Sequence, residues 1–351
     1  MTVRHAAQDL INHAAALLTT AGLAADRAAT VAGILVEGDL LGHDTHGLAL
    51  LAPYLGELEQ GRMTASGEPE IVSQRSAVQA WDGRRLPGPW LTVKAIDACI
   101  AMARDCGTGT VTIRRSHHIA ALAAYLRRAT DCGMLIQLVC SDPNAASVAP
   151  FGGLDPVFTP NPMAYGIPNG DQPVLVDVSC SITTNGMSAR LVKEGRRFPG
   201  AWLLDSEGNP SDDPRHGTPA GGGTIQLLGG LENGHKGFGL TLWVEALTGA
   251  LAAHGRADSK EGWGATVFVQ VLDPAAFGGV EGAARQIAHV IDACHASRPR
   301  RAGTPVRVPG ERGLARRAAQ LARGVELHAS IMPLLAPWQE KLGVAAPAAL
   351  P

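Results

Sequence analysis

The densest group of chemically active side chains lies between two glycines, in the segment Gly42-His43-Asp44-Thr45-His46-Gly47. Histidine has an unperturbed pKa near neutrality, so it can give or take a proton at cellular pH. The glycines permit a tight turn, and loops between helices often carry catalytic groups. We interpret the segment as a candidate proton-transfer site. The alternative is that both imidazoles only cap helix ends.

A second cluster, Arg114-Arg115-Ser116-His117-His118, follows an apolar strand and precedes a predicted helix. In an α/β protein such a junction directs backbone N–H groups and polar side chains toward a crevice where ligands bind. An arginine pair on the surface with a helix cap from Ser116 would explain the same residues equally well.

Three further segments could hold an anionic ligand. Residues 234–240, GHKGFGL, place a lysine where a helix is expected to begin, and a helix N-terminus suits phosphate or carboxylate. Residues 177–186 form a hydroxyl-rich stretch at the end of a strand, and Pro309-Gly310-Glu311 is a turn before a helix. Each of the three is also explained by an ordinary loop or turn. The sequence contains neither a Walker A motif nor a GxGxxG motif after a strand, so a standard Rossmann site is not expected.

Histidine spacing also permits a chemistry of another class. His43, His46 and His118, with Asp44, could ligate zinc and support a hydrolase. The spacing is not HExxH, and the chain lacks the GxSxG elbow of serine hydrolases. We therefore expect no metal site and keep a zinc-dependent hydrolase only as an alternative.

The elements that position these groups follow from hydrophobic periodicity. The predicted helices span residues 5–20, 25–41, 48–60, 91–104, 119–130 and 240–251, with two or three more at the end of the chain. The predicted strands span residues 76–81, 108–114, 134–140, 173–178, 201–205 and 267–272. Residues 229–239 are predicted to be a glycine-rich loop. Helices that alternate with buried strands indicate an α/β protein with a mixed sheet.

Composition narrows the class of partner. The chain has 351 residues, a formal net charge of −2 and 46% hydrophobic residues, which gives no electrostatic reason to expect nucleic acid as partner. It contains no apolar run of membrane-spanning length and no signal-peptide pattern. The six cysteines form no CxxC pair, which indicates a reducing compartment. We expect a cytoplasmic enzyme that acts on a small molecule.

Seven segments in this order resemble the type-2 malate/L-lactate dehydrogenase family. They are GHDTHGL at 42–48, RSHH at 115–118, APFGG at 149–153, TPNPMAYGIP at 159–168, VLVDVS at 174–179, GHKGFGL at 234–240 and VPGE at 308–311. The family also includes ureidoglycolate dehydrogenase, diketogulonate reductase, sulfolactate dehydrogenase and reductases of cyclic imines such as piperideine carboxylate. The resemblance covers nearly the whole chain.

The resemblance implies a non-Rossmann mixed-sheet fold with a helical N-terminus. It implies a discontinuous domain of residues 1–118 and 258–351, an inserted cofactor-binding domain of residues 119–257, and a homodimer with the active site between the domains. The implied activity is hydride transfer between NAD or NADP and a small 2-hydroxy or 2-oxo acid. Reduction of a cyclic imine is the alternative within the family.

The resemblance also implies roles for individual residues. The histidine matching His46 is the proton donor and acceptor, and the one matching His118 lies beside substrate and cofactor. We expect Thr45, Arg114 and Ser116 to contact the substrate. The expected cofactor-binding residues are Asp177, Ser179, Ser181, Thr183, His235, Lys236, Gly237, Pro309, Gly310 and Glu311.

One position departs from the family pattern Ser-His-Gly-x-x-Arg. This chain has Thr45, which keeps the hydroxyl, but it has Leu50 where the family has arginine. Position 50 lies one helical turn after His46 and faces the substrate carboxylate in the family, so a bidentate anion clamp is lost. The substrate could carry a larger apolar group, its carboxylate could bind Arg114 or Arg115, or activity could be weak.

Overall fold

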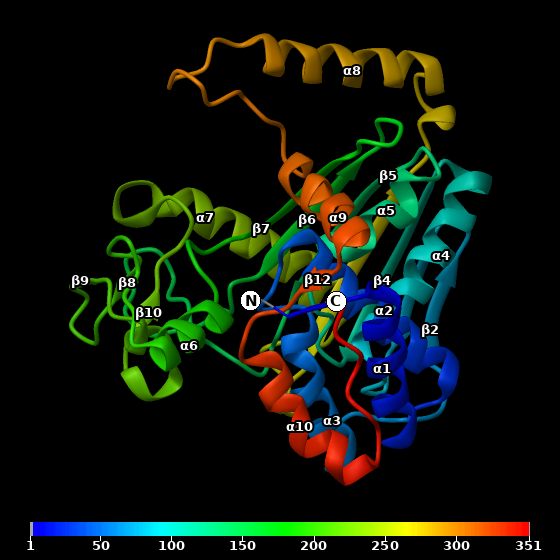
Figure 1. Ribbon diagram of the computed structural model, residues 1–351. Coiled ribbons are helices and arrows are strands. Elements are labelled where there is room, and N and C mark those ends of the chain that lie inside the picture. The colour runs from blue at the N-terminus through cyan, green and yellow to red at the C-terminus, as the bar shows by residue number, and fades with distance from the viewer. Residues whose placement is uncertain (1–2, 351) are drawn as a thin grey trace.

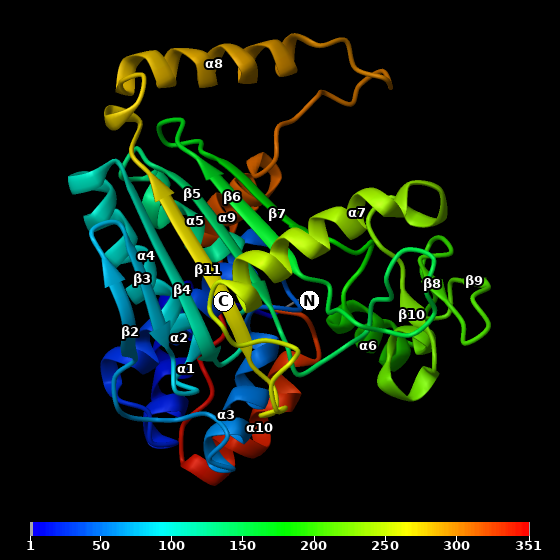
Figure 2. The same ribbon diagram turned by 180° about the vertical axis from the view of Figure 1, so that it is seen from behind.

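A seven-stranded sheet forms the centre of the protein, of which the computed structural model describes residues 3–350 (Figure 2). The strands lie in the order β2-β3-β4-β11-β5-β6-β7, and in this sheet every neighbouring pair except β3–β4 runs antiparallel. Their bounds are β2 Glu70–Arg75, β3 Val78–Asp82, β4 Thr108–Ser116, β5 Leu135–Ser141, β6 Pro162–Ile167, β7 Val174–Ser179 and β11 Ala265–Leu272. The predicted mixed sheet of an α/β protein is confirmed.

Helices cover one face of this sheet and enclose the main hydrophobic core (Figure 1). They are α1 Ala7–Thr20, α2 Ala25–Leu41, α3 Leu51–Glu59, α4 Gly88–Cys106, α5 Ala123–Thr130, α9 Glu311–Arg323 and α10 Ile331–Leu342. Alternate residues of the central strands face opposite sides: Val267 and Val269 enter the main core, whereas Phe268 packs on the other face. The predicted helices at the N-terminus are confirmed, with α2 over the predicted range and a 3-10 turn, η1 Leu48–Leu50, leading into α3.

The opposite face of the sheet carries helix α7, Gly230–Glu245, which continues into a π-helical turn, Ala246–Ala250 (Figure 2). The prediction of a loop over residues 229–239 is therefore wrong. The glycines there permit close packing rather than flexibility, since a methyl group on Gly237 would lie 2.6 Å from the carbonyl oxygen of Leu228 and 2.9 Å from that of Cys180.

Strands β2 and β6 escaped prediction. All six residues of β2 are exposed, so the alternation that marks a half-buried strand is missing. Strand β6 begins at Pro162, a residue type that argues against a strand interior.

A second, smaller core lies beside the sheet. Helix α6, Asn185–Glu194, packs there with the short strands β8 Leu203–Leu204, β9 Pro210–Ser211 and β10 Thr224–Ile225. Figure 1 shows this lobe apart from the N-terminal helices. In the main body, the short strand β1 Arg4–His5 pairs antiparallel with β12 Val325–Glu326 and so brings early and late parts of the chain together. Strands β5, β6 and β7, all within residues 119–257, share one sheet with β4 and β11.

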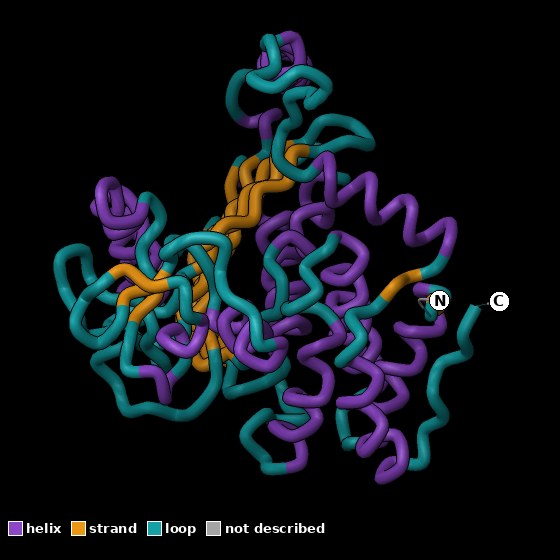
Figure 3. The backbone as a smooth tube through the Cα atoms, turned by 60° about the vertical axis from the view of Figure 1, so that its left-hand side comes forward, coloured by secondary structure: helices purple, strands orange, loops and turns teal. Residues whose placement is uncertain are grey.

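Helix α8, Val280–Ala296, together with the preceding residues from Phe277, stands away from the body at the end of the sheet and is called the arm below (Figures 1 and 3). Within residues 280–296 only Ile291 is buried. Phe277, Val280 and Val290 are more than half exposed, so this arm carries an apolar surface that the described chain leaves uncovered.

The start of α4 fixes the backbone of the predicted His117–His118 pair. A methyl group on Gly88 would overlap the carbonyl oxygens of His117 and His118. Glycine is required there because the backbone of α4 lies directly against the backbone of residues 117–118, and the contact holds the end of β4 against the first turn of α4.

Among residues 3–350, no helix is both long and apolar enough to cross a membrane.

Candidate active site

Residues 42–47, hereafter the histidine turn, connect α2 to η1 over a buried carboxylate. Asp39 is 3% exposed, and one of its oxygens accepts a hydrogen bond from the Leu48 amide at 2.7 Å. A methyl group on Gly47 would overlap that carboxylate, so the turn can close only over glycine. Burial raises the pKa of Asp39 to about 7.

His46 projects from this turn with one ring nitrogen engaged. Its Nδ1 lies 2.8 Å from the hydroxyl of Thr45. Burial, and then the nearby charges of His43 and Arg190, lower the pKa of His46 to about 4. The imidazole is therefore neutral at pH 7. With Nδ1 held by Thr45, Nε2 is the ring nitrogen that could exchange a proton with a ligand.

His118 faces His46, with the two ring centroids 5.9 Å apart. The amide of Ala120 donates to Nδ1 of His118 at 3.3 Å, and the hydroxyl of Tyr54 lies 2.9 Å from the same atom. An acceptor at Nδ1 assigns the ring proton to Nε2 in the neutral tautomer. Burial holds the pKa of His118 well below its usual value, so its Nε2–H is a neutral hydrogen-bond donor.

Trp263 completes the aromatic surroundings of His118. Its ring stacks on that of His118 with centroids 4.6 Å apart and planes 29° apart, and Tyr54 lies 5.6 Å from the same indole. Neither Tyr54 nor Trp263 was predicted. Tyr54 lies on α3, whereas His46 lies in the turn before that helix, so helical periodicity did not connect the two. Trp263 precedes β11 and carried no local signal.

A cleft with a volume of about 410 Å³ opens beside His46. It is lined by the histidine turn, residues 120–122, parts of the stretch 177–184, and the side chains of Met187 and Trp202. A second cavity of about 280 Å³ adjoins it, because His43, Asp177 and Val178 line both. Adjacent cavities of this size, partly apolar and partly polar, suit a small organic ligand or cofactor.

Most of the expected cofactor-binding residues of the hydroxyl loop, residues 177–183, reach this cleft. Asp177, Ser179 and Thr183 line it, whereas Ser181 is 3% exposed. The Ser181 hydroxyl donates to the Thr183 carbonyl at 2.7 Å, which shapes the loop from behind. One Asp177 oxygen accepts the amide of Ala123 at 2.8 Å and so joins the loop to the first turn of α5.

The turn before α9 and the start of α7 are placed differently. Pro309 and Gly310 line the second cavity, and Glu311 accepts from His295 of the arm at 2.5 Å. His235 and Lys236 lie on the exposed face of α7, while Gly237 packs against the chain behind the hydroxyl loop. The lining of the two cavities does not include these three residues of α7.

Of the residues expected to contact the substrate, one lies in the cleft and the others are bound to neighbouring groups of the fold. Thr45 lies in the cleft beside His46. Arg114 Nε donates to the buried carboxylate of Asp82 at 3.0 Å, and Arg115 binds the same carboxylate. The Ser116 hydroxyl, 1% exposed, donates to the carbonyl of His117. Arg114, Arg115 and Ser116 are therefore engaged within the fold.

The side chain at position 50 lies in an apolar environment. Leu50 is partly buried and packs against the main core. In residues 3–350, no group of three or more His, Cys, Asp or Glu side chains is spaced to hold a metal ion.

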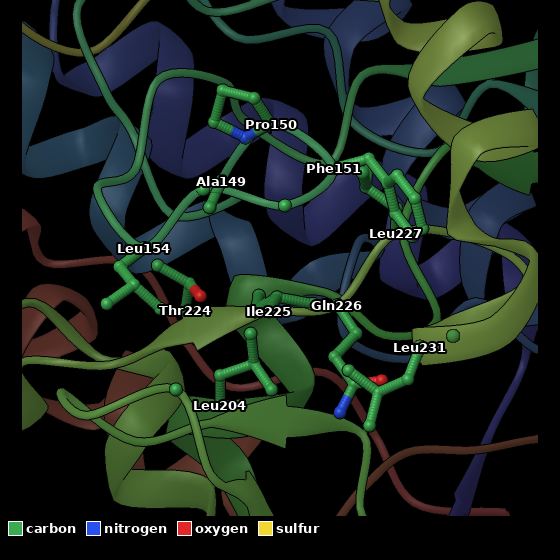
Figure 4. A pocket seen from close by; sticks show the side chains of 14 residues that line it. Ala149, Pro150, Phe151, Leu154, Leu204, Thr224, Ile225, Gln226, Leu227 and Leu231 are labelled. Carbon is green, nitrogen blue, oxygen red and sulfur yellow. The ribbon is translucent and has the colours of Figure 1, made fainter.

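A separate pocket of about 260 Å³ lies in the smaller lobe (Figure 4). Figure 4 shows Pro150 and Phe151 in the upper part of the view, with Leu204 and Leu231 across from them. Its lining includes no ionisable side chain, so it offers nothing for proton transfer.

Comparison with known proteins gives consistent results across the chain. The family model described as malate/L-lactate dehydrogenase matches residues 5–336. An L-lactate dehydrogenase of Cupriavidus necator is 29% identical over 95% of this chain and 96% of its own length. A malate dehydrogenase of Pyrococcus horikoshii is 27% identical over 93% and 92%, and a Delta(1)-pyrroline-2-carboxylate reductase of Burkholderia ambifaria is 28% identical over 90% and 92%.

Solved structures agree. A malate dehydrogenase of Entamoeba histolytica superposes with a TM-score of 0.92 over 99% of this chain and all of the other, at 21% identity. A dehydrogenase of Sinorhizobium meliloti is 30% identical, with a TM-score of 0.85 over 97% and 98% of the two chains. The expected resemblance is confirmed, and the chain belongs to the malate/L-lactate dehydrogenase family.

Proposed function

We propose that this protein is an NAD(P)-dependent oxidoreductase that interconverts a small 2-hydroxy acid and its 2-oxo acid. The observation that carries the proposal is the facing pair of neutral histidines, His46 and His118, of which His46 lines a cleft walled by the hydroxyl loop. Relatives named malate, lactate and sulfolactate dehydrogenases support the substrate class.

A nicotinamide cofactor, when bound, supplies or accepts the hydride. The residues that would hold it are Asp177, Ser179, Thr183, Pro309 and Gly310, which line the two adjacent cavities. The hydroxyl and backbone groups there suit the sugar and phosphate parts of a dinucleotide. We propose a non-Rossmann cofactor site within residues 119–257, completed by the turn before α9.

His46 would exchange the proton. In oxidation its neutral Nε2 accepts the hydroxyl proton as hydride leaves the substrate carbon, and in reduction it returns a proton to the carbonyl oxygen. The lowered pKa of His46 favours the basic form and hence the oxidative step. His118 would donate its Nε2–H to the substrate oxygen and orient it, with Tyr54 and Trp263 fixing the ring.

The substrate carboxylate must bind a group other than the arginine that the family resemblance implies. The family arginine is replaced by Leu50, and Arg114 is engaged by Asp82. A substrate with an apolar group next to the reacting carbon would suit Leu50, at the position that the family resemblance places beside the substrate carboxylate. A second candidate is reduction of a cyclic imine acid, favoured by the likeness to the pyrroline-2-carboxylate reductases.

A second copy of the chain is the proposed partner of the arm. The exposed Val280 and Val290 of α8, together with the exposed Leu240 and Trp243 of α7, present apolar surface on two helices. In a homodimer these faces would be removed from water. Val290→Asp should lower the dimer fraction in sedimentation velocity, because it buries a charge, whereas Val192→Asp on α6 should not. A monomeric wild-type protein would refute this assembly.

Cofactor binding is testable through the cleft wall. Val178 is 40% exposed and lines both cavities, so Val178→Trp should fill them with little effect on the folded core. In wild type, NADH or NADPH should raise Tm, since a ligand that binds only the folded state stabilises it by about 2.7 kcal/mol at a hundredfold excess over Kd. Val178→Trp should lose that shift.

Val192→Trp is the matched control, because Val192 is 39% exposed on α6 and lies outside both cavities. Absence of any shift in wild type at millimolar nucleotide would rule out the nicotinamide proposal. A full shift in Val178→Trp would place the nucleotide elsewhere on the protein.

Proton transfer is testable at His46. His46→Gln should lower kcat by roughly 10²–10⁴-fold, as expected for a positioned acid–base group, while the cofactor-induced Tm shift persists. In wild type the pKa of His46 lies below 6.5, so the unprotonated imidazole, which is the basic form, persists as the pH falls past 6.5. The kcat/KM for oxidation should stay on its plateau there, whereas reduction should quicken with acidity. Unchanged turnover in His46→Gln would move the role to another group.

Leu50→Arg tests the loss of the anion clamp. The guanidinium should improve use of pyruvate by roughly tenfold to a hundredfold in kcat/KM, the worth of a charge-assisted hydrogen bond of about 1.5–3 kcal/mol. It should impair a bulky apolar 2-oxo acid, because an unpaired buried charge is unfavourable. Leu50→Met is the control of similar size. Efficient use of pyruvate by wild type, with no gain in Leu50→Arg, would show that another group holds the carboxylate.

A further inference from the structure

An ion pair joins the histidine turn to helix α6 directly behind His46. Arg190 Nη1 donates to a carboxylate oxygen of Asp44 at 2.7 Å, and Nη2 donates to the main-chain carbonyl of Asp44 at 2.8 Å. The Arg190 side chain is 15% exposed and that of Asp44 36%. A guanidinium that binds both the side chain and the backbone of Asp44 restricts the turn more than an ion pair between two surface side chains does.

The two ends of this contact belong to different cores. Leu191, the neighbour of Arg190, is part of the smaller core, whereas Leu41 and Leu48, on either side of the histidine turn, belong to the main core. The contact therefore bridges the two lobes that wall the cleft. Arg190 lines a cavity on the far side of the turn, together with Thr45 and Ala49, and so supports the turn from behind.

Helix α6 also meets the imidazole itself. Gly186 lies one turn before Arg190, and a methyl group there would be 3.6 Å from His46 Cε1 and 3.6 Å from Thr45 Cβ. The first turn of α6 thus lies against the ring while Arg190 holds the preceding residues. A shift of α6 would move His46 relative to the cleft, and such displacements of about 1 Å can lower rates a hundredfold.

We propose that Arg190 is a positioning residue that holds the proton-transfer histidine in place by clamping the histidine turn to α6. This inference rests on the proposed role of His46. The clamp acts through Asp44 and does not require Arg190 to touch substrate or cofactor.

The charged and polar groups around His46 make the clamp measurable. His43, Asp44 and Thr45 face it from its own turn, Arg190 from α6 and His118 from the end of β4. Arg190 lowers the pKa of His46 and Asp44 raises it. Removing the charge of each partner separately should therefore move that pKa in opposite directions, although both changes weaken the same contact.

The experiment compares Arg190→Gln, Arg190→Lys and Asp44→Asn in the full-length protein. Proton NMR would follow the His46 ring signal, assigned by its loss in His46→Gln, through a pH titration without substrate. The pKa of His46 should rise in Arg190→Gln, fall in Asp44→Asn and change least in Arg190→Lys. Turnover should fall about tenfold or more in Arg190→Gln with little change in KM, and Arg190→Lys should recover part of it.

Lys193→Gln, on the same helix and three residues later, is the control for charge alone and should leave kcat within twofold. Tm of each variant separates loss of folding from loss of positioning. Shifts of the His46 pKa in the same direction in both variants, or unchanged turnover in Arg190→Gln, would overturn the clamp. Opposite shifts in a protein that turns over no 2-oxo acid or cyclic imine would instead retain the clamp and reject the proposed function.

Discussion

The position of β11 between β4 and β5 determines where the chemistry of this protein can occur. The strand pairs antiparallel with both neighbours, so its first residues lie beside the last residues of each: Ala265 opposite Ser116, and Thr266 opposite Ser141. His118 follows β4 and Trp263 precedes β11, so the two rings meet at this end of the sheet. Without that strand, β4 and β5 would lose their shared neighbour, and Trp263 would not be held against His118.

Burial of the imidazoles controls their protonation state in the site. Burial lowers the pKa of His46, His117 and His118, so the fold favours their uncharged forms. The stability that these groups contribute is present above their unfolded pKa near 6.5 and is lost as the pH falls toward the folded values. The same desolvation that makes the histidines useful at neutral pH thus makes the fold sensitive to acid.

Leu50 departs from the arginine that the family resemblance implies at this position. An arginine there would need a counter-charge, and the Arg114–Asp82 pair shows how firmly this fold satisfies such groups. The indole of Trp263, stacked on the ring of His118, gives that histidine an apolar neighbour, and Leu50 adds no charge to the fold. The histidine turn keeps its geometry through Asp39 and Gly47, which do not depend on residue 50.

Local pattern was sufficient for much of the fold and for part of the site. Helices α1 and α2 and the inner strands β4, β5 and β11 were foreseen because their apolar spacing is dictated by a buried face. Periodicity failed for α7, where glycines serve close packing, and for the fully exposed β2. Motif order indicated His46, His118 and the hydroxyl loop, since short segments carry that chemistry in consecutive residues.

Only the tertiary structure brought Trp263 to His118 and Arg190 to Asp44, which are separated by 145 and 146 residues in the chain. It also engaged Arg114 with Asp82 and turned Lys236 to the exposed face of α7. These outcomes depend on strand order and on which side of a helix is buried. A sequence specifies residue types and local spacing, whereas long-range partners follow from the packing of surfaces that no single segment contains.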